Sequence, residues 1–364
     1  MNSENVMDMK RIRCRERFLS NNLALHLLYL AGLPCSLPVL GATTTLVLIP
    51  AILYGCTSPI AGNENMETVV HISGLPTKAA EKAECIDILI FNDDRMQKLD
   101  TYQRFEMTVL PDIKIGSSVG EKLMAAVLNS GKSTCDWAGI LSRTSLREVY
   151  VNLENESTAY PVMSGEGRIQ AGVPINIKVE RLASEVVLRS LGCHFHGKGY
   201  EDEVLKNIRV YLTNVNAEAP LFTEESYAPK RLVNRGGLET SDINGFVEPG
   251  ILLQELDYSI SDATINPDIR LRCFPNEVGA ESLAAAFTRL VIEGEVAGEI
   301  YYWPIDINRD EGGKGISRNC RYIFDINITR LGHRNPDTPI ETSVAEIKME
   351  IEPWEEKEDY GVRF

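Results

Sequence analysis

The sequence predicts an all-β protein in which two antiparallel β-sandwich domains follow an apolar N-terminal leader. Apolar and polar residues alternate with a period of two in many segments after the leader, which is typical of strands with one buried face. Glycine, proline and asparagine separate these segments, and helical periodicity is rare. Many short strands with such turn signals favour a sandwich.

The leader occupies the first 55 residues and predicts export from the cytoplasm. A basic patch, "KRIRCRER", precedes two apolar stretches, and the second stretch ends at Leu53-Tyr54-Gly55-Cys56. This boundary resembles a bacterial lipobox, in which the chain is cleaved before a cysteine that carries a diacylglyceryl group and fatty acids such as palmitate. An alternative is a transmembrane helix over residues 37–53, although its two prolines argue against an uninterrupted span. Either anchor would tether the rest of the chain outside the cytoplasm.

The strands expected after the leader alternate clearly in four segments. They are 173–180, 207–215, 288–296 and 321–329, whose apolar faces consist of Val173, Ile175, Ile177 and Val179; Ile208, Val210 and Leu212; Leu290, Ile292 and Val296; and Tyr322, Phe324, Ile326 and Ile328. By contrast, "CIDILIFND" is apolar on both faces from Ile86 to Phe91, which indicates a central strand.

Two helices are expected within the first sandwich. "VGEKLMAAVLN", residues 119–129, has the composition of a helix, and residues 145–153 open with a Ser-x-x-Glu capping box, Ser145 to Glu148. Strand signal restarts directly after "VPINIKVER", which predicts a domain boundary near residues 181–184. The expected organisation is a leader (1–55), a lipid-anchored linker (56–66), an N-terminal sandwich (67–182) and a C-terminal sandwich (183–364).

Charge and cysteine content limit the function classes. Of the 364 residues, five cations and three anions precede Cys56, so the remaining 32 cations and 49 anions give the rest of the chain a net charge of −17. Such a surface repels nucleic acid and anionic membranes. The five cysteines after Cys56 are scattered, which predicts neither a disulfide framework nor a metal site of paired cysteines.

Histidines give the sequence its main candidate metal site. His194 and His196 are two residues apart, so on a strand both imidazoles share one face. Metal sites need further ligands, and the only other histidines after the leader are His71 and His333, each isolated in sequence. The expectation is therefore two histidines on a solvated face, with no metal and no cofactor.

Other motifs do not predict catalysis. Asp306, Asn308 and Asp310 have the spacing of a calcium loop, but the positions that an EF-hand fills with glycine and glutamate are Glu311 and Ser317. Ser164 stands beside a glycine without completing the Gly-x-Ser-x-Gly motif of a hydrolase nucleophile, and "GGKGIS" lacks the spacing of a phosphate loop. We therefore expect a protein that is not an enzyme.

Several longer phrases, in this order and spacing, resemble the fimbrillins of type V pili, which include the lipid-anchored fimbrial subunits of Bacteroidales. They are "YPVMSGEG", "INIKVERLASEVVL", "VYLTNVNAEAPL", "FTRLVIEGEVAGEIYYWPIDIN" and "GISRNCRYIFDINITRLGHRNPDTPI". The resemblance implies two transthyretin-like β-sandwich domains, export as an outer-membrane lipoprotein and assembly by strand exchange. In that mechanism a protease removes the first strand of one subunit, and the C-terminal strand of a neighbour fills the groove.

Both strands can be identified in this sequence. The tail "AEIKMEIE" places Ala345, Ile347, Met349 and Ile351 on one face, as a donor strand requires, although the same strand could instead close its own domain. The expected first strand is residues 68–75.

The connection after that first strand contains no arginine, because the first arginine after Cys56 is Arg95. Lys78 and Lys82 leave cleavage by a lysine-directed protease open. A retained first strand would suit an anchor or another terminal subunit.

Together these observations predict a cell-surface lipoprotein that is a structural subunit of a fimbrium and takes part in cell adhesion. Its expected partners are other fimbrial subunits and the outer membrane, held through a lipid on Cys56. The alternatives are a surface glycan-binding lipoprotein, for which Tyr301, Tyr302 and Trp303 are candidate contacts, and an extracellular hydrolase.

Overall fold

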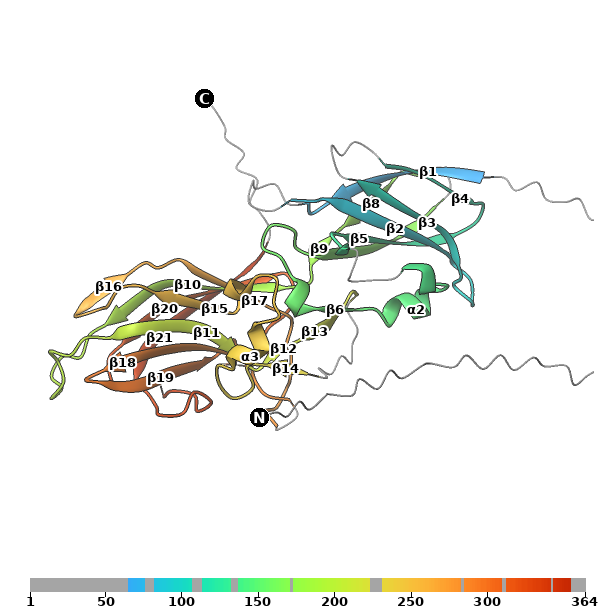
Figure 1. Ribbon diagram of the computed structural model, residues 1–364. Helices are drawn as coiled ribbons and strands as arrows, with labels where there is room; N and C mark the ends of the chain where they lie inside the picture. Colours follow the sequence, from blue (N-terminus) through green and yellow to red (C-terminus); the bar gives the residue numbers. More distant parts are fainter. Residues whose placement is uncertain are drawn as a thin grey trace, which may run out of the picture. The chain divides into compact units, whose positions relative to one another are not determined.

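The computed structural model shows an all-β protein (Figure 1). It describes residues 65–75, 82–106, 113–131, 137–170, 173–222, 231–282, 285–309, 312–341 and 343–354. Helices in this part of the chain are single turns, the longest of which are α2 (Arg143–Arg147) and α3 (Thr240–Ile243). None of the helices in these ranges is long and apolar enough to cross a membrane.

Two sheets are built from the first half of the described chain. A three-stranded sheet has the order β4-β1-β8, and a five-stranded sheet has the order β3-β2-β5-β7-β9. Their strands are β1 (Asn65–Ser73), β2 (Cys85–Asn92), β3 (Leu99–Glu106), β4 (Ile113–Ser118), β5 (Lys122–Leu128), β7 (Met163–Ile169), β8 (Ile175–Lys178) and β9 (Glu180–Arg181). An apolar cluster that includes Val70, Ile88, Ile115 and Ile177 lies between these strands.

Two further sheets are built from residues 184–353. One has the order β16-β10-β20-β21, with β17 also paired to β10, and the other has the order β15-β11-β18-β19. Their strands are β10 (Ser184–Cys193), β11 (Lys206–Thr213), β15 (Leu253–Leu256), β16 (Ala263–Ile265), β17 (Ile269–Cys273), β18 (Arg289–Val296), β19 (Glu299–Asp306), β20 (Cys320–Ile328) and β21 (Ala345–Pro353). Two short ladders complete the fold, β6 (Tyr150–Asn152) with β13 (Glu218–Pro220) and β12 (Val215–Asn216) with β14 (Leu232–Val233).

The strand pattern read from the sequence is confirmed. The apolar faces expected on β11, β18 and β20 are buried, and β2 is a central strand buried on both faces. Val173 is the exception, because it precedes β8 and its side chain is 53% exposed. The sheets are also not purely antiparallel, since β1 pairs with β8 and β10 with β20 in parallel. The domain boundary at residues 182 and 183 stays a prediction.

The helix expected at residues 119–129 is wrong, because this segment contains strand β5. Every residue from Lys122 to Leu128 is buried, with β2 paired on one side and β7 on the other. Alanine, leucine and methionine favour helices, but this preference amounts to well under 1 kcal/mol per residue. Burial on both faces of the sheet outweighs it, as tertiary context often does.

The helix expected over residues 145–153 is wrong in extent, because α2 begins earlier and ends at Arg147, and residues 150–152 form strand β6. Ser142 is the N-cap of α2, and its hydroxyl accepts a hydrogen bond from the Ser145 backbone N–H at 3.2 Å. The Ser145 hydroxyl accepts one from the Ser142 N–H at 3.1 Å, so two serines form the capping box. Glu148 is the C-cap, and the predicted pairing of Ser145 with Glu148 is therefore wrong.

Candidate functional site

The first described strand, β1, lies in the middle of its sheet. It pairs with β4 antiparallel from Asn65 to Val70 and with β8 parallel from Val70 to Ser73. Met66, Thr68, Val70 and Ile72 form its inner face, on which Thr68 and Val70 are buried and the other two pack partly against the apolar cluster. Removal of β1 would therefore leave a groove between β4 and β8 with an apolar floor.

The predicted cleavage sites lie in the connection from β1 to β2. Lys78 lies outside the described residues, whereas Lys82 is exposed and its backbone N–H donates to the Ala159 carbonyl at 2.6 Å. Arg95 is exposed in the turn between β2 and β3. Cleavage at Arg95 would separate β2, of which only Asn92 is not buried, together with β1, so this arginine is not placed to release β1 alone.

The last described strand, β21, lies at the edge of its own sheet. It pairs antiparallel with β20 over nine residues, from Ala345 opposite Ile328 to Pro353 opposite Cys320. Only Ala345 on its apolar face is buried, while Ile347 is 37% and Ile351 48% exposed and Met349 is partly buried. The structure thus places the predicted donor strand in its own domain, with an apolar face that this domain leaves incompletely covered.

The polar face of β21 is held by ion pairs to neighbouring strands. Arg189 on β10 donates to Asp325 at 2.9 Å and to Glu350 at 3.2 Å. The hydrogen bond from Arg189 lowers the pKa of the Asp325 carboxyl to about 2. Because these groups are partly exposed, such bridges contribute little stability individually.

Trp354 anchors the end of β21 much more firmly. Its side chain is 3% exposed, and the guanidinium carbons of Arg181, Arg272 and Arg321 lie 4.9, 4.9 and 5.8 Å from the ring centroid. The Trp354 backbone N–H donates to the Asn319 carbonyl at 2.8 Å, and the Trp354 carbonyl accepts from the Arg181 guanidinium, also at 2.8 Å. Desolvated cations over an indole face attract it strongly.

The two terminal strands have matching patterns. Each is nine residues long, and each presents four alternate side chains to one face: Met66, Thr68, Val70 and Ile72 on β1, and Ala345, Ile347, Met349 and Ile351 on β21. A strand with the pattern of β21 could therefore occupy the place of β1 with its apolar side chains on the core side.

The aromatic residues considered for glycan binding do not form an exposed platform. Trp303 is completely buried, and its indole N–H donates to the Arg330 carbonyl at 3.1 Å. Tyr301 lies on the same face as Trp303, with ring centroids 6.4 Å apart. The guanidinium of Arg334 lies 4.1 Å from the centre of the Tyr301 ring, which is thereby covered.

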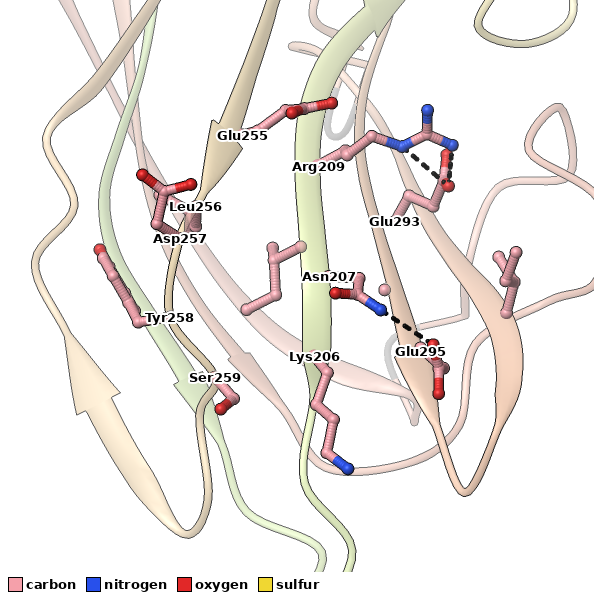
Figure 2. Close-up of a pocket in the computed structure, with 13 residues that line it drawn as sticks. Lys206, Asn207, Arg209, Glu255, Leu256, Asp257, Tyr258, Ser259, Glu293 and Glu295 are labelled. Atoms are coloured by element: carbon pink, nitrogen blue, oxygen red, sulfur yellow. Dashed lines mark hydrogen bonds and ion pairs between the residues drawn. The ribbon is translucent and has the colours of Figure 1, made fainter.

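A pocket of about 620 Å³ lies beside β11 and is lined mainly by charged and polar residues (Figure 2). Glu293 forms an ion pair with Arg209, and Glu295 accepts a hydrogen bond from the Asn207 amide at 2.9 Å. These two carboxylates already have partners. No histidine lines the pocket and its one serine, Ser259, is exposed, so the lining contains no Ser-His pair.

The other motifs have structural roles. The Ser164 hydroxyl is buried and donates to the Leu221 carbonyl, while Arg318 donates to it at 3.2 Å. Asp306 binds Arg289 at 2.7 Å, and Asp310 lies outside the described residues. Four cysteines are free in the described ranges: Cys85, Cys193, Cys273 and Cys320.

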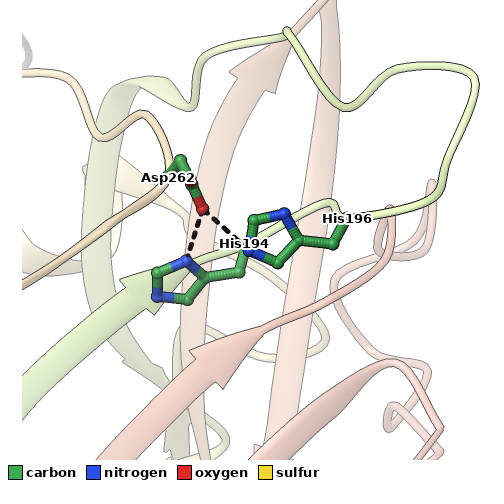
Figure 3. Close-up of side chains that lie close together, drawn as sticks. All are labelled: His194, His196 and Asp262. Carbon is green, nitrogen blue, oxygen red and sulfur yellow. Dashed lines mark hydrogen bonds and ion pairs between the residues drawn. The ribbon is translucent and has the colours of Figure 1, made fainter.

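His194 and His196 point to the same side of the chain, where they meet Asp262 (Figure 3). Asp262 Oδ1 lies 2.8 Å from His194 Nδ1 and 3.1 Å from His196 Nε2. The bond to His194 lowers the pKa of the Asp262 carboxyl. Sequence reasoning found the two histidines but missed Asp262, because no local pattern indicates that a turn so distant in sequence lies beside them.

No protein-family model matches the chain, and no curated protein matches it in sequence. Solved structures do resemble it. A candidate cell adhesion protein from Bacteroides eggerthii covers 80% of this chain and 97% of its own, with a TM-score of 0.61 and 15% identity. A second such protein, from Parabacteroides distasonis, covers 80% and 98%, with a TM-score of 0.59 and 14% identity. A fimbrilin from Porphyromonas gingivalis covers 80% and 98%, with a TM-score of 0.57 and 13% identity.

The chain thus has the all-β sandwich fold of cell adhesion proteins and fimbrilins from Bacteroidales. The fold that the sequence resemblance implied is confirmed. At these sequence identities the similarity concerns the fold alone. The predicted lipid attachment site, Cys56, lies outside the described residues.

Proposed function

We propose that the protein is a non-enzymatic structural subunit of a cell-surface fimbrium that takes part in adhesion and assembles by β-strand exchange. The observation that carries the proposal is the pair of terminal strands in a fold shared with fimbrilins. β1 is the middle strand of a sheet, and β21 is an edge strand with a matching pattern and two isoleucines more than a third exposed. A groove vacated by β1 would accept such a strand through main-chain hydrogen bonds and alternate side chains.

The strand-exchange proposal is tested by charging the donor face. The double substitution Ile347→Glu and Ile351→Glu places carboxylates at positions that are exposed in the single chain but would be buried in a neighbour's groove. We expect the variant to fold and to lose the polymer ladder on unheated denaturing gels. Ile300→Glu is the matched control, because Ile300 is 47% exposed on β19 and should leave the ladder intact. An unchanged ladder in the double variant would refute strand donation by β21.

We further propose that opening the groove requires cleavage at Lys78 or Lys82. Lys82 is exposed just before β2, so a cut beside it would separate β1 from the rest of the chain. The variant carrying Lys78→Gln and Lys82→Gln should then retain β1 and serve only as a terminal subunit. Mass spectrometry of protein from the cell surface distinguishes the two forms. A wild-type mature chain that retains β1 within internal fibre positions would contradict this step.

The proposed anchor is a lipid on Cys56 in the outer membrane. A basic and apolar leader that ends at this cysteine supports it. Metabolic labelling with a palmitate analogue should mark the wild-type protein, and Cys56→Ala should abolish the label and release the protein into the medium. Labelling that persists in Cys56→Ala would refute the attachment site.

A further inference from the structure

His194, His196 and Asp262 bring three side chains of metal-ligating type together at one place on the surface. Both imidazoles direct a nitrogen at the same carboxylate oxygen, at 2.8 and 3.1 Å. The three ligand atoms all lie within 4.8 Å of one another. Tetrahedral bonds of about 2.0–2.1 Å around Zn²⁺ separate neighbouring ligand atoms by about 3.3–3.4 Å. Asp262 would therefore move slightly away from the two imidazoles to admit the ion.

The backbone holds these side chains in place from two elements. Cys193 on β10 is paired with Ala263 on β16, so the residues just beyond this pair, His194 and Asp262, are adjacent. Between the two histidines, Phe195 is 3% exposed and packs edge-on against Tyr200 at 5.2 Å. Because Phe195 points inward, both imidazoles face the opposite, solvent-exposed side, where their rings stack 5.8 Å apart.

The second nitrogen of His194 also has the environment of a metal ligand. His194 Nε2 lies 3.3 Å from the Thr264 hydroxyl. Imidazoles that bind metal through one nitrogen commonly donate a hydrogen bond through the other, which fixes the tautomer and the ring orientation. Without a metal, Nδ1 carries the proton that it donates to Asp262. With a metal bound, Nε2 would carry the proton and donate it to the Thr264 hydroxyl, and Nδ1 would give its lone pair to the cation.

We propose that His194, His196 and Asp262 bind one divalent transition-metal ion, of which Zn²⁺ is the probe. Two imidazoles and one carboxylate suit such borderline cations and leave a coordination position for water. The ion would join the end of β10 to the turn before β16. This inference is independent of strand exchange, because the residues involved belong to neither β1 nor β21.

Calorimetric titration of the full-length, untagged protein with ZnCl₂ tests the proposal. We expect one Zn²⁺ per chain. Asp262→Asn keeps a residue that tolerates the φ of 43° at this position, yet removes the charged ligand. Asp262→Asn and His196→Asn should each weaken Zn²⁺ binding by about tenfold or more, because removal of a direct ligand costs at least as much affinity as removal of a residue that only orients a ligand. Equal affinity in either variant would overturn the site.

Two histidines outside the cluster provide matched controls, since His71→Asn and His333→Asn make the same change elsewhere. Both variants should bind Zn²⁺ like the wild type, and a tenfold loss in either would mean that the ligands are misassigned. Thr264→Val should weaken binding by about tenfold to a hundredfold, because it removes the hydroxyl that orients His194. Unchanged affinity in Thr264→Val would show that His194 does not bind through Nδ1.

X-ray absorption of the zinc-loaded protein identifies the ligands directly. Nitrogen and oxygen scatterers at about 2.0–2.1 Å, with the outer-shell signal of two imidazoles, are the expected result. A sulfur shell at about 2.3 Å would indicate cysteine ligation and overturn the assignment.

Discussion

Trp354 gives the sharpest test of how the C-terminal strand is held. Truncation in Trp354→Ala removes a side chain that is 3% exposed and lies against three guanidinium groups. Replacement of a buried tryptophan by alanine costs about 3–5 kcal/mol, and a desolvated cation over the ring accounts for up to about 2 kcal/mol of that. We therefore expect the free energy of unfolding to fall by about 3–5 kcal/mol.

The loss should be local before it is global. Trp354 lies directly after β21, so amide hydrogen exchange of residues 346–353 should accelerate in Trp354→Ala much more than exchange in β2 or β5. Urea denaturation followed by far-UV circular dichroism measures the global effect, and exchange read by mass spectrometry measures the local one. Trp354→Phe is the control, because it keeps an aromatic face for the arginines and should cost only about 1–2 kcal/mol.

Two outcomes would refute this reasoning. A loss below about 1 kcal/mol in Trp354→Ala would mean that the surrounding arginines do not depend on the ring. Exchange that accelerates equally in β21 and in the buried strand β2 would mean that Trp354 supports the whole fold rather than the end of one strand.

Two further predictions concern charged groups. Arg189 lowers the pKa of Asp325 to about 2, below that of an unfolded aspartate, so the bridge stabilises the protein above about pH 4 and is lost as the pH falls toward 2. The urea midpoints of the wild type and of Asp325→Asn should therefore converge between about pH 4 and about pH 2. A difference that stays constant over this interval would contradict the assignment. Lys122 is 2% exposed and binds Asn92 and Asp100. Lys122→Met should therefore lower the free energy of unfolding, measured by urea denaturation, by about 3–5 kcal/mol, and the double variant with Asp100→Asn should recover part of that loss. If the double variant recovers nothing, the loss comes from packing alone.

The sequence predicted strands with alternating apolar residues, and also β2, whose run of isoleucine and leucine favours a strand buried on both faces. On β11, β18 and β20 the apolar residues alternate because one face meets the core and the other does not. β5 shows no period of two either, but its alanine, leucine and methionine favour a helix, so its composition misled the interpretation. Boundaries also depended on tertiary context, since Ser142 and not Ser145 caps α2.

Contacts between distant segments could not be predicted from local patterns. β10 and β20 pair in parallel although more than a hundred residues separate them, and nothing in either segment specifies that partner. The same reason explains why Asp262 was missed beside His194 and why Trp354 was not expected among three arginines. Alternation within β21 did indicate its apolar face, but the exposure of Ile347 and Ile351 depends on the edge position that β21 takes in the sheet.

The exposure of two isoleucines on β21 and the burial of Trp354 have opposite effects on the free energy of strand exchange. Full burial of an isoleucine contributes about 1.5–3 kcal/mol, so completing the burial of Ile347 and Ile351, now 37% and 48% exposed, would add only about 1 kcal/mol each. Freeing Trp354 from its arginines would cost about 3–5 kcal/mol. The exposed face of β21 alone therefore cannot drive donation. The larger contribution to the free energy of strand exchange would come from closing the groove of a neighbour that has lost β1. In that open groove the core around Ile115 and Ile177 and the unpaired edges of β4 and β8 would otherwise be exposed to water. An intact chain that retains β1 should accordingly stay monomeric even at high concentration.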